Sequence, residues 1–99
     1  MTAIAHQSEA ELQGAVIDLA ERLRWLVYHT HDSRHSAKGF PDLCLARGER
    51  LVFAELKTEN GKLSDAQREW LQALEIAGAE CFVWRPSQFD EILGELRRT

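Results

Sequence analysis

The chain has 99 residues and a hydrophobic fraction of 44%, which is enough for one globular core and leaves little room for a second. Its net charge of −4 argues mildly against a protein that coats nucleic acid by bulk charge, and it does not exclude an enzyme that meets phosphate through a few local cations. The sequence has no apolar run that could span a bilayer and no secretory signal. We therefore expect one cytoplasmic domain over residues 8–99, preceded by a disordered segment at residues 1–7.

The first half of the chain predicts one helix and three strands. Ser8 and Glu11 match a capping box, and the apolar residues after them repeat with helical spacing to about residue 24. A polar loop at residues 31–41 separates the first strand from a hairpin. The three strands are predicted at residues 25–30, 42–46 and 51–57. Cys44 and Cys81 fall in strand-like runs, where reduced thiols of the core are the ordinary expectation.

The second half predicts two helices around a fourth strand. Ser64 is the expected cap of the first, Gly78 is placed to end it, and residues 80–84 form the strand. Ser87 is the expected cap of the last helix. The expected buried positions are Ala66, Trp70, Ala73, Leu74 and Ala77 in the first helix and Phe89, Ile92, Leu93 and Leu96 in the second. The order α-β-β-β-α-β-α predicts an α/β fold in which helices flank a mixed four-stranded sheet.

Three charged groups interrupt the predicted hairpin. Glu55 and Lys57 project from the same face of their strand, because side chains alternate along a strand. A four-residue turn pairs Ala46 with Leu51, and this register places Asp42 opposite Glu55. Two carboxylates at that separation repel each other unless a cation lies between them, and oxygen ligands suit Mg²⁺ or Mn²⁺.

Lys57 would stand next to such a cation. Its ammonium could orient or deprotonate a water molecule, or stabilise charge that develops on phosphorus. The alternative for Glu55 and Lys57 alone is an ordinary surface ion pair on a strand, because the pattern E-x-K is common.

The two glutamates at the start of the first helix differ in direction. At 100° per residue, Glu9 lies about 40° from the centre of the apolar stripe, whereas Glu11 points about 120° away from it. Glu11 therefore caps the helix and faces water, and Glu9 follows the side that faces the sheet. The alternative for Glu9 is a favourable contact with the helix dipole.

The loop before the hairpin carries groups that suit phosphate. Ser33, Arg34, Ser36 and Lys38 have the chemistry to hold phosphate oxygens, and the loop leads directly to Asp42. A plain solvated loop is the first alternative. Zinc is the second, since the loop and its surroundings also contain His29, His31, His35 and Cys44, but the spacing H-x-H-x3-H fits no common zinc site.

These residues together resemble a known signature. The segment Gly39-Phe40-Pro41-Asp42, then twelve residues, then Glu55-Leu56-Lys57 resembles the PD-(D/E)XK nucleases, and most closely their VRR-NUC branch. That branch also has an E-x-x-x-Q/E element on its first helix, here Glu9 to Gln13, and a Gln in the first turn of a later helix, here Gln67. The resemblance covers residues 8–96 and implies a restriction-endonuclease-like fold.

The resemblance also implies roles for individual residues. Asp42 and Glu55 would be metal ligands, with the backbone carbonyl of Leu56 as a third, and Lys57 would be the catalytic lysine. Glu9 would complete the site, either as a ligand or through a water molecule. Gln67 would be a supporting polar residue, although it also completes a capping box with Ser64.

The implied function is DNA cleavage. Members of the family cut DNA phosphodiesters with Mg²⁺ or Mn²⁺ and act on branched or flapped DNA, including Holliday junctions in phage and bacterial forms. We expect a homodimer, because coordinated cutting of a junction needs two sites, with apolar contacts from Tyr28, Trp84, Phe89 and Leu93. The alternative is a module of the same fold that binds branched DNA or a protein without cutting, and such a relative would be expected to lack one of Asp42, Glu55 and Lys57.

Overall fold

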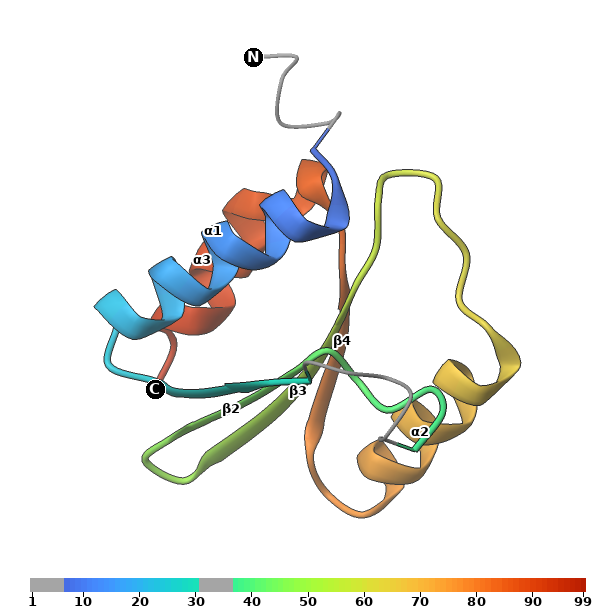
Figure 1. Ribbon diagram of the computed structural model, residues 1–99. Coiled ribbons are helices and arrows are strands. Elements are labelled where there is room, and N and C mark those ends of the chain that lie inside the picture. Colours follow the sequence, from blue (N-terminus) through green and yellow to red (C-terminus); the bar gives the residue numbers. More distant parts are fainter. Residues whose placement is uncertain (1–6, 31–36) are drawn as a thin grey trace.

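The computed structural model describes residues 7–30 and 37–99, which form a sheet with helices on both faces (Figure 1). The elements are α1 (Glu9–Arg22), β1 (Leu26–His29), β2 (Leu43–Arg47), β3 (Arg50–Leu56), α2 (Asp65–Ile76), β4 (Glu80–Trp84), the short 3₁₀ turn η2 (Pro86–Gln88) and α3 (Phe89–Arg97). No described helix is both long and apolar enough to cross a membrane. Most of the predicted disordered segment lies outside the described residues, as do Ser33, Arg34 and Ser36 of the predicted phosphate loop.

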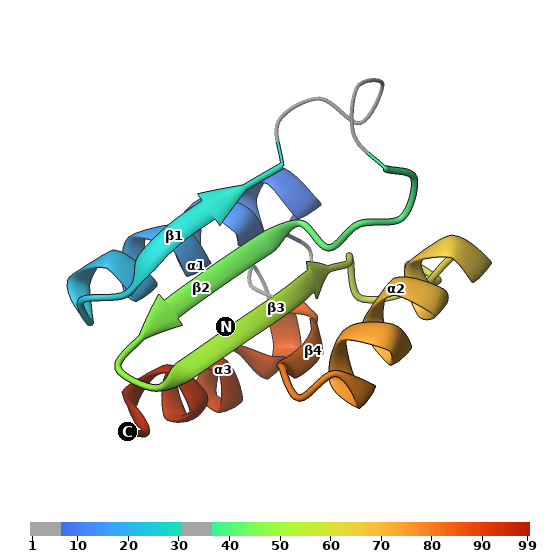
Figure 2. The same ribbon diagram turned by 90° about the horizontal axis from the view of Figure 1, so that it is seen from below.

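The sheet has the order β1-β2-β3-β4 and is mixed, as the sequence predicted. The pairs β1–β2 and β2–β3 are antiparallel, and β4 joins β3 in parallel, with α2 as the crossover (Figure 2). In the hairpin, Ala46 pairs with Leu51 and Leu43 pairs with Ala54, which confirms the predicted register. The open end of this hairpin, where β2 begins and β3 ends, therefore brings Asp42 to Glu55.

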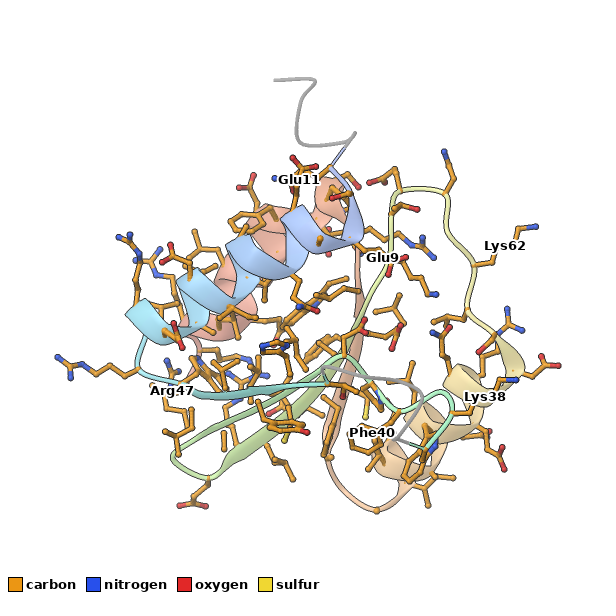
Figure 3. All side chains as sticks on the ribbon, viewed as in Figure 1. Glu9, Glu11, Lys38, Phe40, Arg47 and Lys62 are labelled. Carbon is orange, nitrogen blue, oxygen red and sulfur yellow. The ribbon has the colours of Figure 1, made fainter. Side chains whose placement is uncertain are left out.

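The closed end of the hairpin is fixed by two arginines that satisfy helix-terminal carbonyls. Arg50 is 8% exposed and makes a two-pronged ion pair with Glu80, with both N–O distances at 2.7 Å. Arg47 donates to the carbonyls of Leu23 at 2.9 Å and Arg98 at 2.6 Å. Figure 3 shows Arg47 at the end of the molecule opposite to Lys38 and Lys62. This end is thus a structural anchor, and the charged groups of interest lie at the other.

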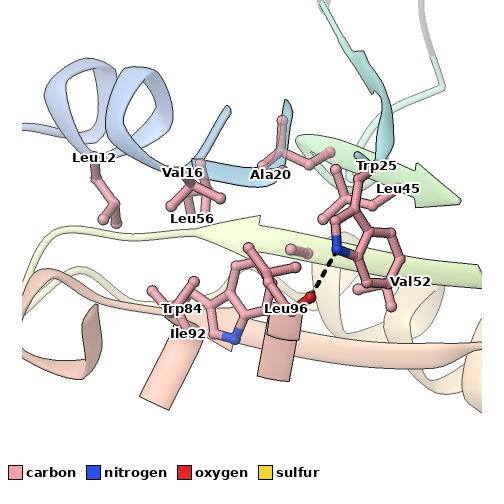
Figure 4. Packing of buried hydrophobic residues seen from close by; sticks show 12 residues of the cluster. Leu12, Val16, Ala20, Trp25, Leu45, Val52, Leu56, Trp84, Ile92 and Leu96 are labelled. Atoms are coloured by element: carbon pink, nitrogen blue, oxygen red, sulfur yellow. Dashed lines mark hydrogen bonds between the residues drawn. The ribbon is translucent and has the colours of Figure 1, made fainter. Parts of the chain in front are cut away.

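The main core lies between the sheet and the pair α1 and α3 (Figure 4). The inward residues of β3 are Val52, Ala54 and Leu56, which alternate with the outward-facing Phe53 and Glu55. Trp25 was predicted within the first strand, but it precedes β1, is 3% exposed, and donates its indole N–H to the carbonyl of Leu96 at 2.9 Å. Packing on this face leaves Glu55 on the opposite face, toward α2.

Two predictions about the helices are wrong. Ser87 does not cap the last helix, because it lies within η2, and its N–H and hydroxyl both donate to the carboxylate of Glu59. In α2 the predicted apolar stripe is only partly used, since Ala73 and Ala77 are exposed and no residue of the helix is fully buried. Ala66, Trp70 and Leu74 of the stripe are half-buried, and Trp70 meets Phe40 edge to face with ring centroids 5.0 Å apart.

Candidate active site

The hairpin register places the Asp42 carboxylate at the end of β3. Asp42 comes immediately before β2, and its Oδ2 accepts the backbone N–H of Leu56 at 2.8 Å. Leu56 would otherwise meet Pro41, which follows from continuing the observed pairing by two steps beyond Leu43 and Ala54. The carbonyl of Pro41 accepts the hydroxyl of Thr30 at 3.2 Å. The N–H of Leu56 donates to the Asp42 carboxylate in place of that carbonyl.

The same geometry leaves the carbonyl of Leu56 without a ladder donor from the opposite residue. Pro41 has no N–H, so it cannot complete the pair of hydrogen bonds that antiparallel residues exchange. In a strand the N–H and C=O of one residue point to the same side, so this carbonyl points to the side from which Asp42 approaches. The carbonyl of Leu56 is therefore left out of the ladder with β2 and points to the side of Asp42.

Glu55 is the most unusual residue of the site. It is a carboxylic acid that is only 2% exposed, and burial, followed by repulsion from Asp42, raises its pKa to about 8. Among the described residues, its Oε1 is a buried oxygen with no hydrogen-bond partner. A carboxylate oxygen without a hydrogen-bond partner, beside a second acid, costs free energy in the protein alone, and a cation bound between the two acids would offset that cost. The donor set, two carboxylates and a carbonyl, fits a hard divalent ion such as Mg²⁺ or Mn²⁺.

Gln67 joins the cap of α2 to this acid. Its Oε1 accepts the N–H of Ser64 at 2.8 Å, which completes the capping box, while its Nε2 donates to Glu55 Oε2 at 3.0 Å. The two roles that the sequence left as alternatives are therefore held by one side chain at the same time. The cap fixes which way the amide faces, so that its donor is directed at Glu55.

Lys57 follows β3 directly and lies beside Glu55. Its side chain is 12% exposed, and its Nζ stands 4.0 Å from Glu55 Oε2, which is a long contact rather than a tight ion pair. The positive charge works against the effects that raise the pKa of Glu55. The ammonium thus lies near the Glu55 carboxylate without forming a tight ion pair with it.

Gly39 brings the loop before Asp42 against α2. Its φ is +85°, and a Cβ at this position would lie 2.5 Å from the backbone carbon of Ala66 and 2.7 Å from the Cβ of Ala66. Only glycine fits such a close approach with that backbone conformation. The contact sets the distance between the strand that carries Asp42 and the helix that carries Gln67.

Glu9 lies near the site, but outside a compact ligand cluster. Figure 3 shows Glu9 on the side of α1 toward the loop after β3, while Glu11 points away. Glu11 makes the predicted capping box with Ser8. Glu9 is exposed, yet its charge contributes to raising the pKa of Glu55. In residues 7–30 and 37–99, no three His, Cys, Asp or Glu side chains gather as a metal site, so Glu9 fits the role of acting through water better than that of a direct ligand.

We expect the substitutions Glu9→Gln and Glu11→Gln to have different effects. Glu9→Gln removes a charge that acts at Glu55, and loss of such a neighbour of a metal ligand costs about 10- to 100-fold in activity. Glu11→Gln keeps an acceptor for the capping box, so cleavage and melting temperature should stay close to wild type. Initial rates of plasmid nicking measure both variants. The reverse order of effects would show that the wrong face of α1 has been assigned to the site.

Gln67→Glu separates the two roles of Gln67. Glutamate serves a capping box as well as glutamine does, but it cannot donate to Glu55 and brings another negative charge there. We expect the fold to persist and the cleavage rate to fall by about 10-fold or more. Gln72→Glu makes the same chemical change at an exposed position of the same helix and should cut normally. Equal rates for the two variants would reduce Gln67 to a helix cap.

Four residues of the predicted phosphate loop were assigned to DNA, and Lys38 is the one of them that lies within the described residues. It is exposed, and Figure 3 places it on the same side of the sheet as α2. The zinc alternative needs His31 and His35, which lie outside the described residues. Sequence reasoning missed how closely Gly39 packs on Ala66, although the G-x-P-D motif pointed to this glycine.

Comparisons with known proteins agree with this geometry. The sequence matches the VRR-NUC domain family over residues 5–88. A solved VRR-NUC domain protein superposes with a TM-score of 0.74 over 93% of this chain and 87% of its own, at 21% identity, which is evidence of the fold alone. A solved VRR-NUC domain has a TM-score of 0.72 and 27% identity, with 87% and 94% covered.

A curated relative shares a shorter stretch. A Fanconi-associated nuclease 1 homolog from Schizosaccharomyces pombe is 40% identical over 47 residues, which are 46% of this chain and 7% of that protein. The chain therefore spans a small part of the length of this relative. Because the family match extends over most of the sequence, and the mixed sheet with flanking helices agrees with the solved domains, the chain belongs to the VRR-NUC domain family.

Proposed function

We propose that this chain is a metal-dependent, structure-specific endonuclease that hydrolyses phosphodiester bonds in branched DNA such as Holliday junctions or flaps. Membership of the VRR-NUC family and the similarity to a Fanconi-associated nuclease support a nuclease. The observation that carries the proposal is Glu55, a buried acid with an orphaned oxygen, next to Asp42 and Lys57. One cytoplasmic domain over residues 8–99 is part of the proposal.

The protein groups that would hold the metal are the carboxylates of Asp42 and Glu55 and the carbonyl of Leu56, with Glu9 acting through a water molecule. A bound Mg²⁺ or Mn²⁺ would supply neutralisation of phosphate charge and a water molecule that ionises more readily. The buried Glu55 favours such an ion, because a nearby cation offsets both burial and repulsion by Asp42. The N–H of Leu56 orients Asp42, and the amide of Gln67 orients Glu55.

Lys57 would act on the other side of the reaction. Its ammonium has three donors and no acceptor, and it lies at the end of the strand where it can donate to a phosphate oxygen or to the attacking water. Donation to a phosphate oxygen favours the transition state, in which more charge collects on that oxygen than in the substrate. The site thus supplies what hydrolysis of a phosphodiester needs, namely charge neutralisation, an oriented water and a fixed donor.

The DNA would approach along the side of the sheet that carries α2. Lys38 is exposed there, and we assign Ser33, Arg34 and Ser36 of the same loop to phosphate contacts on their chemistry. Contacts of this kind position the backbone and do not read the base sequence. Selection among junctions, flaps and duplexes would therefore depend on shape.

Cleavage of a panel of labelled DNA tests the proposal. Four-way junctions, flaps, single strands and duplexes are incubated with the protein in Mg²⁺, in Mn²⁺ and in a chelator. The proposal expects cuts only with metal and faster cutting of the branched substrates. Cutting that persists in the chelator would overturn the metal site, and equal rates on duplex and junction would overturn the structure specificity. Tight junction binding without any cutting would establish the non-cutting module instead.

A homodimer remains part of the proposal, but its predicted surface needs correction. Trp84 is 3% exposed and stacks on Phe82 within the fold, so it is not available to a partner. Phe89 and Leu93 are half-buried, and Phe89 packs on the core. Tyr28, in contrast, is 60% exposed. It shares a sheet face with Leu26 and Leu51, which follows from the pairs Leu26–Ala46, Ala46–Leu51 and Tyr28–Cys44. An uncovered apolar face of this kind is typical of association.

Light scattering coupled to size exclusion is expected to give the mass of two chains at micromolar concentration. Tyr28→Glu places a charge in the apolar face and should shift the protein toward one chain, without changing a residue of the metal site. Ile76→Glu, at a 79% exposed position on α2, is the matched control and should leave the mass unchanged. A wild type that has the mass of one chain, with and without junction DNA, would rule the dimer out.

A further inference from the structure

The turn that follows Lys57 is tied to the end of β4 by one arginine. Arg85 donates through Nη1 to the carbonyls of Thr58 at 2.7 Å, Gly61 at 2.7 Å and Glu59 at 3.3 Å. The turn is closed by a further bond of 3.2 Å from the N–H of Gly61 to the carbonyl of Thr58. Three carbonyls of one turn thus converge on one guanidinium, which is a preorganised group with fixed donor directions.

A second contact ties the same turn to the segment after β4 through the side chain of Glu59. The carboxylate of Glu59 accepts the N–H of Ser87 at 3.0 Å and the hydroxyl of Ser87 at 2.6 Å. These hydrogen bonds lower the pKa of Glu59. The segment after β4 therefore bonds the turn at two places. Arg85 donates to the backbone carbonyls of the turn, and Ser87 donates to the side chain of Glu59.

The same turn runs alongside the side chain of Lys57. A Cβ built on Gly61 would lie 3.5 Å from Lys57 Cδ, so the turn passes beside the lysine side chain with room for little more than a methyl group between them. On the other side, the N–H of Lys57 donates to the carbonyl of Trp84 at 3.0 Å, and Arg85 is the next residue. A lysine side chain that is only 12% exposed is thereby kept within 4.0 Å of Glu55, although a free lysine has many rotamers.

We propose that Arg85 is a positioning residue for the nuclease reaction, and that it acts through the turn at residues 58–61 to hold the Lys57 ammonium toward the scissile phosphate. The inference rests on the proposed function, since it gives Lys57 a part in cleavage. Arg85 itself touches neither substrate nor metal in this assignment. Arg85 would matter because it fixes the position of the Lys57 ammonium, and displacement of a reacting group by about 1 Å can cost 100-fold in rate.

A double-mutant cycle tests the dependence on Lys57. We expect Arg85→Ala to lower kcat on the best DNA substrate by about 10- to 100-fold, with KM for DNA and the affinity for Mn²⁺ unchanged. In the background of Lys57→Ala, the same substitution should change kcat by less than about twofold, because the group that it positions is already gone. Single-turnover rates at high enzyme concentration make the slow variants measurable.

Arg47→Ala is the matched control. Arg47 also holds backbone carbonyls, those of Leu23 and Arg98, but at the closed end of the hairpin and away from the site. Its loss should lower the melting temperature and leave kcat of the folded protein close to wild type. Where Arg85→Ala melts too low to assay, Arg85→Lys carries the same cycle, because lysine keeps the charge but not the fork of donors.

The outcomes separate this inference from the proposed function. A wild type that does not cut, or a Lys57→Ala variant that cuts normally, overturns the nuclease site itself. A required Lys57 together with additive effects of Lys57→Ala and Arg85→Ala overturns only the positioning role and makes Arg85 a residue of stability alone. A loss of kcat in Arg85→Ala that disappears in the Lys57→Ala background supports the inference.

Discussion

Asp42→Asn and Glu55→Gln are each expected to abolish metal-dependent cleavage while the protein stays folded. Each substitution keeps the size of the side chain and removes an anionic oxygen that a hard cation requires. A catalytic metal supplies several kcal/mol of transition-state stabilisation, and about 1.4 kcal/mol is tenfold in rate, so the loss should reach about a thousandfold. Cleavage of a labelled junction in Mg²⁺ and in Mn²⁺ measures it. Full activity in either variant would overturn the assignment of the site.

Glu55 should also make the stability of the metal-free protein depend on pH. The pKa of Glu55 is raised to about 8 in the folded protein. An unfolded glutamate has a pKa of about 4.3, so folding favours the protonated acid. The stabilisation from Glu55 is therefore complete below the unfolded pKa and is lost as the pH rises through about 8. Metal-free wild type should lose stability over this range, and Glu55→Gln should not.

Thermal melts in a chelator at about pH 5 and pH 9 check this expectation. At the higher pH, Glu55→Gln should melt no lower than wild type, and adding Mn²⁺ should raise the melting temperature of the wild type but not that of Glu55→Gln, which lacks one of the proposed ligands. Glu69→Gln, an exposed position on α2, is the matched control and should follow the wild type. A Glu55→Gln variant that melts well below wild type at both pH values would mean that contacts of Glu55 stabilise the fold, and that its ionised form does not destabilise it.

The parts of the site that depend on neighbouring residues could be predicted from the sequence. The pairing of Asp42 with Glu55 follows from the side-chain period of a strand and the length of one turn, and the structure has that register. The capping boxes of Ser8 and Ser64 are equally local, and both are present. Such features need only the geometry of the backbone and a few consecutive residues.

The parts that depend on tertiary packing could not be predicted. Arg85 reaches a carbonyl 27 residues earlier in the chain, and no pattern in the sequence marks that contact. Ser87 looked like a helix cap, but it lies within η2, and its hydroxyl is directed to the carboxylate of Glu59. Trp84 was assigned to an interface as a residue of the last strand, whereas it packs in the core with Ile92 and Leu96 of α3. Each error came from a partner that lies far away in the sequence.

Lys57→Ala is expected to lose most of the cleavage rate and still bind Mn²⁺. Groups that donate or accept protons in the transition state contribute about 100- to 10,000-fold, and the loss should lie in that range. Metal binding should survive, because the proposed ligands are oxygens of Asp42, Glu55 and Leu56, while the ammonium stands 4.0 Å from Glu55. Lys62→Ala removes an exposed cation five residues later and should retain most of the activity.

Calorimetric titration with Mn²⁺ separates a catalytic lysine from a structural one, provided that the pH is chosen with Glu55 in mind. Lys57 lowers the pKa of Glu55, so its removal leaves that acid protonated to a higher pH. At neutral pH the ion must then displace a proton that is held more tightly than in wild type, and the apparent affinity should fall, whereas at about pH 9 it should match or exceed that of wild type, since a repelling charge has also gone. Recovery of binding at high pH without recovery of cleavage would assign Lys57 to water and phosphate. Loss of Mn²⁺ binding at every pH would assign it to the structure of the site.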